Sequence, residues 1–147
     1  METSLRIQFG SIPPDTPFYT RPGSYAVFFN DQGLAGMVRN DNGHYFLAGG
    51  GIDPGETKEA AIIREVAEET GLLVEVESYL GVAAEYFYSP GNQLYVNKVG
   101  HFFLVKPIGF DSSLKIEDDH TLLWLPVEEA YPLMYHEIYR WALDKVR

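Results

Sequence analysis

The chain has 147 residues, close to the usual size of one domain, and 46% of them are apolar, so it can bury a full hydrophobic core. Its formal net charge of −10 argues against duplex nucleic acid or an anionic membrane as a partner, since both bind through basic surfaces. The absence of cysteine excludes disulfides, zinc–thiolate sites and thiol catalysis, and without a membrane-length apolar run or a signal-peptide pattern we expect a soluble, cytoplasmic protein.

The first 23 residues differ from the rest of the chain in their high proline content. The prolines from Pro13 to Pro22 disfavour both helices and central strands. We therefore expect residues 1–23 to form an extended arm with one short edge strand at Leu5–Phe9, and residues 24–147 to form the domain. The apolar arm either covers a sheet edge or a second subunit, which would make a homodimer, or it stays mobile.

Three short β-prone segments follow, separated by turn-forming residues. Apolar and aromatic residues predict strands at Ser24–Phe29, Leu34–Arg39 and His44–Leu47. Asn30–Gly33 and Asn40–Gly43 are turns by composition, and the second contains the Asn-Gly pair of a tight hairpin. We expect Leu34–Arg39 to return as the partner of the strand before it.

The clearest helix in the sequence is Thr57–Thr70, which has acidic residues near its start and Gly71 in the position that suits a left-handed end. Beyond it Val74–Tyr88 is predicted as one strand, or as two strands with a bend at Gly81. A returning strand, a loop, a last strand and two helices follow: Leu94–Val105, Lys106–Glu117, Thr121–Leu125, Pro126–Ala130 and His136–Val146. Strands on both sides of a central helix predict an α/β fold of the α+β type, in which helices flank a mixed sheet.

Three glutamates share one face of this central helix. At ~100° per residue, Glu65, Glu68 and Glu69 fall within an arc of roughly 100°. They repel one another unless a cation lies among them, and Mg²⁺ and Mn²⁺ prefer such hard oxygen ligands. Arg64 lies beside them and can pair with Glu56 to hold the preceding turn against the helix. Glycines just before this turn allow a backbone carbonyl to approach a metal, so the segment predicts a site for a divalent metal and phosphate.

The spacing of these residues resembles the signature of the Nudix hydrolase family, whose members include MutT-like proteins. The matching positions are Gly50, Glu56, Arg64, Glu65, Val66, Glu68, Glu69, Gly71 and Leu72. With average residue frequencies, such a match arises by chance on the order of 10⁻⁹ per window. Ala48 stands where the family usually has proline, but it touches none of the expected ligands. The resemblance covers about residues 20–147 and implies an α/β/α sandwich with a mixed sheet between helices.

The resemblance also implies roles for the residues that match. Glu65 and Glu69 are the expected main ligands of Mg²⁺ or Mn²⁺, Glu68 a further ligand, and the carbonyl of Gly50 a backbone ligand. Glu56, Arg64 and Gly71 are expected to be structural. The first candidates for the catalytic base are Glu65 and Glu68, and an acid outside the signature is the alternative.

A few residues outside the signature are further candidates. Glu117, Asp118 or Asp119 would supply a later ligand or base, unless they belong to a solvated loop, and the adjacent His120 is a weaker candidate for a contact with base or phosphate. For substrate binding we select three residues: Arg39, Tyr45 and Glu85. If these residues do not bind substrate, Arg39 is a surface charge, Tyr45 is a packing residue and Glu85 is an outward-facing residue of a strand. Lys98 is a weaker candidate for phosphate.

Two functions remain open at this level. The first is metal-dependent hydrolysis of a diphosphate linkage in a small nucleoside diphosphate derivative. The alternative is a module of the same fold that binds a nucleotide without cleaving it; the intact set of acidic positions favours the enzyme. Nucleoside triphosphates, nucleotide sugars, ADP-ribose and dinucleoside polyphosphates all remain as substrates, and the many aromatic residues favour a triphosphate or a dinucleotide.

Overall fold

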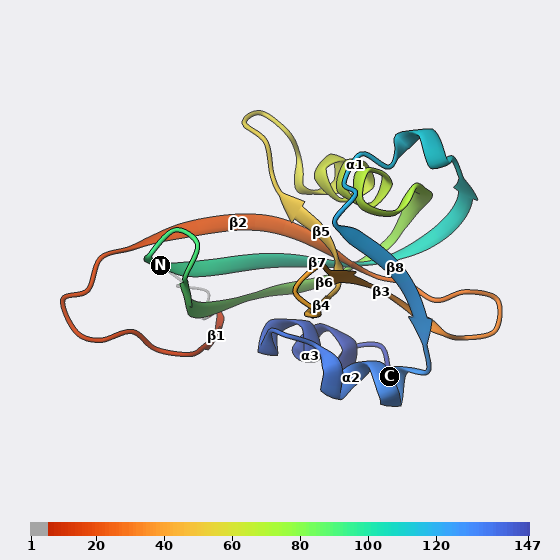
Figure 1. Cartoon of the computed structure of the whole chain (residues 1–147). Coiled ribbons are helices and arrows are strands. Elements are labelled where there is room, and N and C mark those ends of the chain that lie inside the picture. The colour runs from red at the N-terminus through yellow and green to blue at the C-terminus, as the bar shows by residue number, and fades with distance from the viewer. Residues whose placement is uncertain (1–5) are drawn as a thin grey trace, which may run out of the picture.

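The computed structural model describes residues 6–147, and Figure 1 shows their arrangement. The elements are β1 Ile7–Phe9, β2 Phe18–Val27, β3 Ala35–Asn40, β4 Tyr45–Phe46, β5 Ala48–Gly51, α1 Lys58–Thr70, β6 Leu72–Ser89, β7 Leu94–Phe110, the 3₁₀ turn η1 Ser112–Leu114, β8 His120–Leu125, α2 Val127–Leu133 and α3 Glu137–Asp144. Within residues 6–147, none of the helices has the length and apolar character needed to cross a membrane.

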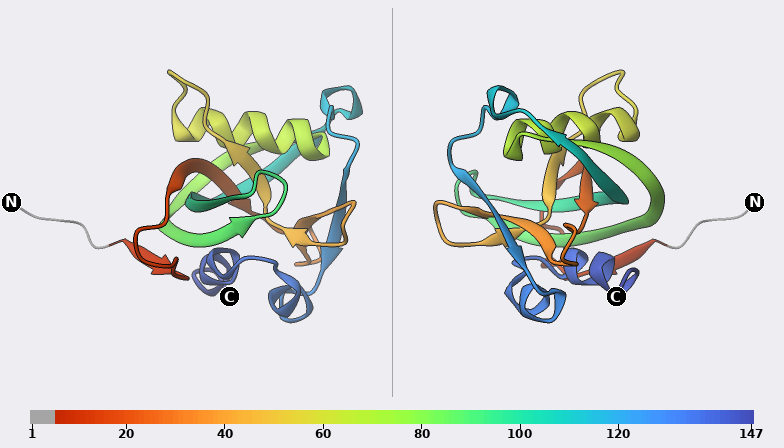
Figure 2. Two further views of the ribbon diagram at one scale, coloured as in Figure 1. Left: turned by 60° about the vertical axis from the view of Figure 1, so that its left-hand side comes forward. Right: turned by 90° about the vertical axis from the view of Figure 1, so that its right-hand side faces the viewer.

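The strands form a mixed sheet that lies between helices. The larger sheet has the order β1-β6-β7-β2-β5, in which β1 runs parallel to β6 and β2 parallel to β7, while the other pairs are antiparallel. A smaller sheet has the order β4-β3-β8. Helix α1 lies on one side of the strands and helices α2 and α3 lie on the other (Figures 1 and 2). The predicted mixed sheet flanked by helices is therefore confirmed.

Alternating residues of β2 supply the two halves of the core. Tyr25 and Val27 pack in the cluster that contains the residues of α3, whereas Ala26 and Phe28 pack in the cluster that contains Ile62 and the other apolar residues of α1. This alternation follows from the period of two in a strand. Because both faces are covered, the strand is apolar throughout this stretch, and each large side chain buried here contributes about 1.5–3 kcal/mol.

Helix α1 begins and ends where the sequence predicts. The Thr57 side chain accepts a hydrogen bond from the backbone N–H of Ala60 at 3.0 Å, which satisfies one of the free donors of the first turn. Gly71 has φ of 81° and donates its backbone N–H to the carbonyl of Ala67 at 2.8 Å. Val66 on this helix is completely buried, and the neighbouring Glu65 and Glu69 line a cavity.

Strand β2 begins six residues earlier than predicted, at Phe18 instead of Ser24, and it includes Pro22. The carbonyl of Pro22 accepts a hydrogen bond from the backbone N–H of Ile52. The regular pairing of β2 with β5 starts one residue later, at Gly23, so Pro22 lies just beyond this ladder. The missing N–H therefore costs no ladder bond. Strand β1 pairs with β6 at the sheet edge, and Leu5 lies outside the described residues. The boundary between arm and domain stays a prediction.

Two other predicted segments differ from the structure. Residues 106–110 are the end of β7 instead of a loop; they pair with the start of β6, and Pro107 is accommodated at a register shift between Leu73 and Val74. Strand β3 does not run beside β2 but pairs with β4 and β8. The turn between β2 and β3 is closed by the bridge between Phe29 and Ala35 and by a hydrogen bond from the N–H of Gly36 to the carbonyl of Phe28. The hairpin between β3 and β4 is confirmed.

Candidate functional site

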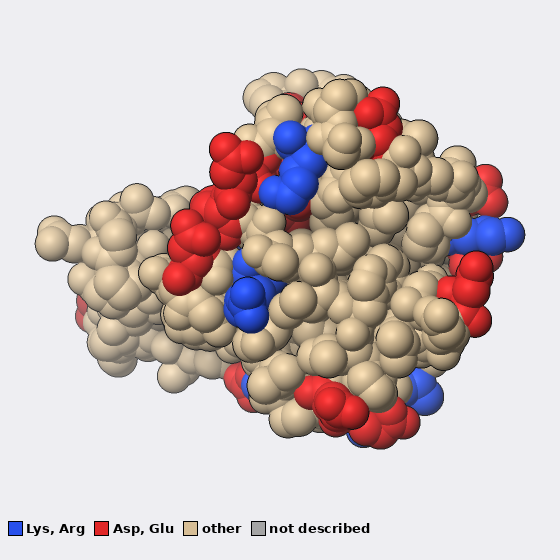
Figure 3. All heavy atoms as spheres, turned by 45° about the vertical axis from the view of Figure 1, so that its right-hand side comes forward, with Lys and Arg blue, Asp and Glu red and all other residues tan. Residues whose placement is uncertain are grey.

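A cavity of about 340 Å³ opens beside β5, at the lower end of the size range of small-molecule sites. The backbone of Gly49, Gly50 and Gly51 forms one wall, and the carboxylates of Glu65 and Glu69 project from α1 into it. Figure 3 shows a hollowed face of the molecule on which acidic and basic side chains lie close together. An added Cβ on Gly50 would lie 2.3 Å from Oε2 of Glu65, so only glycine allows the strand and the carboxylate to approach so closely.

Arg64 is the centre of the polar network on the exposed side of this wall. Its guanidinium donates hydrogen bonds to Glu56 at 2.7 and 2.9 Å, to Glu65 at 2.8 Å and to Glu68 at 3.2 Å. It also donates to the carbonyl of Gly51 at 3.0 Å. The fork of donors on Arg64 thus holds the glycine strand, the following turn and the helix in one arrangement. The hydrogen bond from Arg64 lowers the pKa of Glu56 to about 2.

Glu69 is the most enclosed of the three helical glutamates. One of its oxygens accepts the backbone N–H of Gly49 at 2.8 Å, and only 6% of the residue is exposed. Burial raises the pKa of Glu69 to about 8, and burial also raises the pKa of Glu65. In the absence of a cation, the folded protein therefore disfavours the charged forms of both carboxylates.

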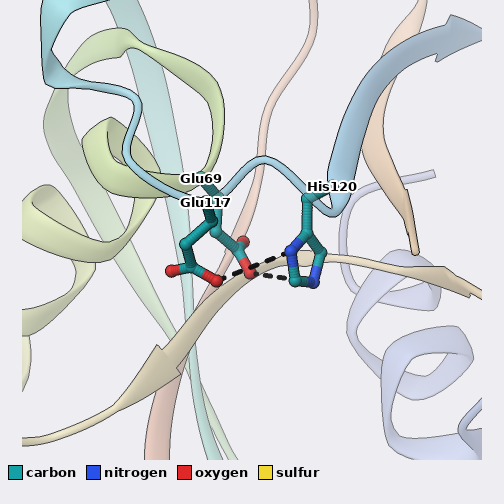
Figure 4. A group of neighbouring side chains, drawn as sticks. All are labelled: Glu69, Glu117 and His120. Carbon is teal, nitrogen blue, oxygen red and sulfur yellow. Dashed lines mark ion pairs between the residues drawn. The ribbon is translucent and has the colours of Figure 1, made fainter. Parts of the chain in front are cut away.

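The loop before β8 adds two residues to the site. The backbone N–H groups of Ile116 and Glu117 donate to the carbonyl of Glu68, at 2.9 and 3.2 Å, which attaches the loop to the end of α1. The Glu117 carboxylate is thereby brought toward Glu69 and His120, and Figure 4 shows the three side chains converging from the helix and the loop. His120 lies 3.6 Å from Glu69 and 3.5 Å from Glu117, measured between ring nitrogen and carboxylate oxygen.

The donor atoms suit a hard divalent cation. Two overlapping sets each have their ligand atoms within 4.8 Å of one another: Glu65, Glu68 and Glu117, and Glu69, Glu117 and His120. Carboxylate oxygens in such groups are the ligands of Mg²⁺ and Mn²⁺, and imidazole also binds transition metals. Of the three acids predicted in this loop, Glu117 takes part in both sets, whereas Asp118 and Asp119 are exposed.

Three residues selected for substrate binding do not line this cavity. Arg39 is exposed on β3 and pairs in register with Tyr45, while the neighbouring residues Asn40 and Phe46 line the cavity instead. Glu85 is buried and accepts hydrogen bonds from His136 at 3.0 Å and from the backbone N–H of Ile138 at 3.1 Å. A direct substrate contact by Arg39, Tyr45 or Glu85 stays a prediction.

Other lining residues were missed or ranked low by sequence reasoning. Arg21 and Lys98 come from neighbouring strands, and Tyr25 and Tyr139 contribute aromatic rings from β2 and α3. Arg21 lies in the segment predicted as an arm, so the sequence held no signal for it. Lys98 is one charged residue in an apolar strand, a pattern that marks it as unusual without indicating which face it occupies.

Solved structures similar to this chain have the same fold. A NUDIX hydrolase from Nitrosomonas europaea matches with a TM-score of 0.70 and 19% identity over 86% of this chain and 87% of that one. A MutT protein from Methanosarcina mazei matches with a TM-score of 0.65 and 21% identity over 90% and 95% of the two chains. These likenesses define the class of fold, a Nudix-type sandwich.

The sequence model of the NUDIX domain matches residues 19–145, and the chain belongs to the Nudix family. It is 39% identical over 96 residues to an ADP-ribose pyrophosphatase of Methanocaldococcus jannaschii, covering 63% of this chain and 53% of that protein. It is 31% identical over 121 residues to the mouse 8-oxo-dGDP phosphatase NUDT18, covering 77% of this chain and 35% of that protein. The match thus spans about half or less of the length of these relatives.

Proposed function

We propose that the chain is an enzyme that hydrolyses a diphosphate linkage in a small nucleoside diphosphate derivative. The observation that carries the proposal is the convergence of Glu65, Glu68, Glu69 and Glu117 beside the glycine wall of a cavity. So many carboxylates in one place are unfavourable for folding and are suited to binding cations and, through them, phosphates. Relatives with related names, such as the ADP-ribose pyrophosphatase, agree with this reaction class.

Mg²⁺ or Mn²⁺ is the proposed cofactor, held by Glu65, Glu68, Glu69, the carbonyl of Gly50 and, in addition to the predicted set, Glu117. When bound, such an ion offsets the charge of the diphosphate and makes a water molecule more acidic. Gly49 orients Glu69 through its N–H, and the deprotonation of water falls to a carboxylate that faces the cavity. We propose Glu65 or Glu68 for this base, and Glu117 is the acid outside the signature that lies near enough to replace them.

The proposal extends to the substrate, the cellular compartment and the oligomeric state of the protein. The substrate is a small nucleotide and not duplex nucleic acid, because the surface carries an excess of acidic residues. We propose a cytoplasmic enzyme whose catalytic domain comprises residues 24–147, preceded by an arm. A homodimer formed through the arm is part of this proposal, and sedimentation analysis of the whole chain would test it.

The test is a hydrolysis assay against a panel of nucleoside triphosphates, dinucleoside polyphosphates, ADP-ribose and nucleotide sugars, with Mg²⁺ and with Mn²⁺. We expect turnover of at least one class, inhibition by a chelator, and a loss of at least 100-fold in Glu69→Gln. The amide oxygen of glutamine can still accept the N–H of Gly49, so the variant should stay folded. Glu59→Gln, an exposed position of α1, is the matched control and should be fully active.

Each result has a clear consequence. Binding of a panel compound without turnover would favour the nucleotide-binding module over the enzyme. Near-normal turnover by Glu69→Gln would refute the assignment of Glu69 as a metal ligand. Equal losses in Glu69→Gln and Glu59→Gln would mean that the assay reports helix stability instead of the site.

A further inference from the structure

The cavity contains a cation outside the Nudix signature, the ammonium of Lys98, which is surrounded by aromatic rings. The ammonium of Lys98 lies over the rings of Tyr25, Tyr139 and Phe46, with Nζ 4.9, 5.3 and 5.7 Å from their centroids. Lys98 is half-buried and lines the cavity. The aromatic faces supply a cation–π contact, which holds the charge in place and also covers the ring surfaces on which a nucleobase would otherwise stack.

No carboxylate neutralises this ammonium in the part of the chain that the structure describes. Among residues 6–147, Lys98 forms no ion pair within 4.0 Å, and the carboxylates of Glu69 and Glu85 act on it from longer range. Its cross-strand partner is Glu85, but both oxygens of Glu85 are engaged, one by His136 and the other by the backbone N–H of Ile138. The charge is therefore fixed in direction and available to a ligand.

A second cation stands beside the first. Arg21 on β2 pairs in register with Lys98 on β7, and both residues line the cavity. Burial and the charge of Arg21 lower the pKa of Lys98 to about 8, although the charges of Glu69 and Glu85 act in the opposite direction. Glu65 and Glu69 lie on another wall of the same cavity, so the sheet presents positive charge where the helix presents negative charge.

We propose that Arg21 and Lys98 form a subsite for a phosphate group additional to the diphosphate held at the carboxylates, so that the preferred substrate class is nucleoside triphosphates. This inference rests on the proposed function. A compound with only two phosphates leaves the two cations unmatched after it is bound at the carboxylates. A terminal phosphate of a triphosphate carries about two negative charges, which two cations on adjacent strands complement.

Two measurements test the subsite with Lys98→Met, Arg21→Met and the control Lys106→Met, which makes the same change at an exposed position of the same strand. The first is calorimetric titration of inorganic tripolyphosphate into metal-free protein in EDTA. We expect the dissociation constant to rise at least tenfold in Lys98→Met and Arg21→Met and to stay unchanged in Lys106→Met. Methionine fits among the aromatic rings, so thermal unfolding should show that Lys98→Met remains folded.

The second measurement compares steady-state hydrolysis of a nucleoside triphosphate with that of ADP-ribose, in the presence of Mg²⁺. Lys98→Met should raise KM for the triphosphate about tenfold and change KM for ADP-ribose less than twofold. Equal increases for both compounds would overturn the proposal, because the cations would then serve the shared diphosphate. If the wild-type protein cleaves no class of the panel, the proposed function fails and the titration alone decides: weaker tripolyphosphate binding in both subsite variants supports the subsite, and unchanged binding overturns it.

Discussion

Replacing Gly50 by alanine should damage the site while leaving the fold nearly intact. The new Cβ would lie 2.3 Å from Oε2 and 2.6 Å from Cδ of Glu65, whereas ordinary contact begins at 3.4 Å. The carboxylate must therefore retreat by about 1 Å. A misplacement of about 1 Å in a catalytic group costs on the order of 100-fold in rate, so we expect kcat/KM to fall by about that factor.

The effect of Gly50→Ala on stability should be much smaller. Gly50 does not have a positive φ, so alanine introduces no backbone strain, and the atoms that it meets belong to the end of a flexible side chain. The main loss is a weaker hydrogen bond between Arg64 and Glu65, now 2.8 Å long. For a partly exposed charged pair this costs about 1 kcal/mol of unfolding free energy.

Gly51→Ala is the control for this prediction, because a Cβ on Gly51 would meet no atom within 4 Å. Both variants would be compared with the wild type by steady-state kinetics with Mg²⁺ and by urea denaturation. We expect Gly51→Ala to retain activity within about twofold and stability within about 0.5 kcal/mol. Near-normal activity in Gly50→Ala, or the same loss in both variants, would refute the reasoning from the contact with Glu65.

Two further predictions concern charged networks. Arg64→Met should lower the midpoint of urea denaturation, because it leaves Glu56 and Glu68 without their shared cation, and Arg64→Lys should restore only part of the loss. Burial lowers the pKa of His136. Burial alone would raise the pKa of Glu85, but the hydrogen bond from His136 outweighs it and lowers that pKa. Both residues bind protons more readily unfolded, so the unfolding free energy should fall as pH drops below 6.5, and His136→Asn should flatten that slope between pH 6.5 and 5.

The central helix and its acidic face could be predicted because their causes are local. A capping threonine, a glycine at the left-handed end and a period of 3.6 residues all lie within Thr57–Gly71, and the structure brings Glu65 and Glu69 to the cavity and Glu68 close to Glu65. Such signals depend on neighbours in sequence, but the choice of packing residues also depends on docking: Ile62 and Val66 are buried, whereas Ile63, which the helical period places near Val66, is exposed.

The rest of the cavity could not be predicted because it depends on register and docking. Side chains alternate along a strand, so a shift of one residue separates Asn40 and Phe46, which line the cavity, from Arg39 and Tyr45, which do not. Arg21 meets Lys98 only because β2 extends past Pro22 beside β7. No local pattern reports a pairing between strands so far apart in sequence.

Glu117 shows how a weak local signal becomes strong in the folded chain. In sequence it is one of several acids in a loop, and solvation alone explains such a residue. In the structure the carbonyl of Glu68 accepts the N–H of Glu117, so the same helix that carries the proposed metal ligands also positions the loop. Burial already raises the pKa of Glu65 and Glu69, and the charge of Glu117 raises both pKa values further. A fold that brings an additional negative charge to such a place gains nothing in stability from it, so the position of Glu117 is better explained by a bound cation than by packing.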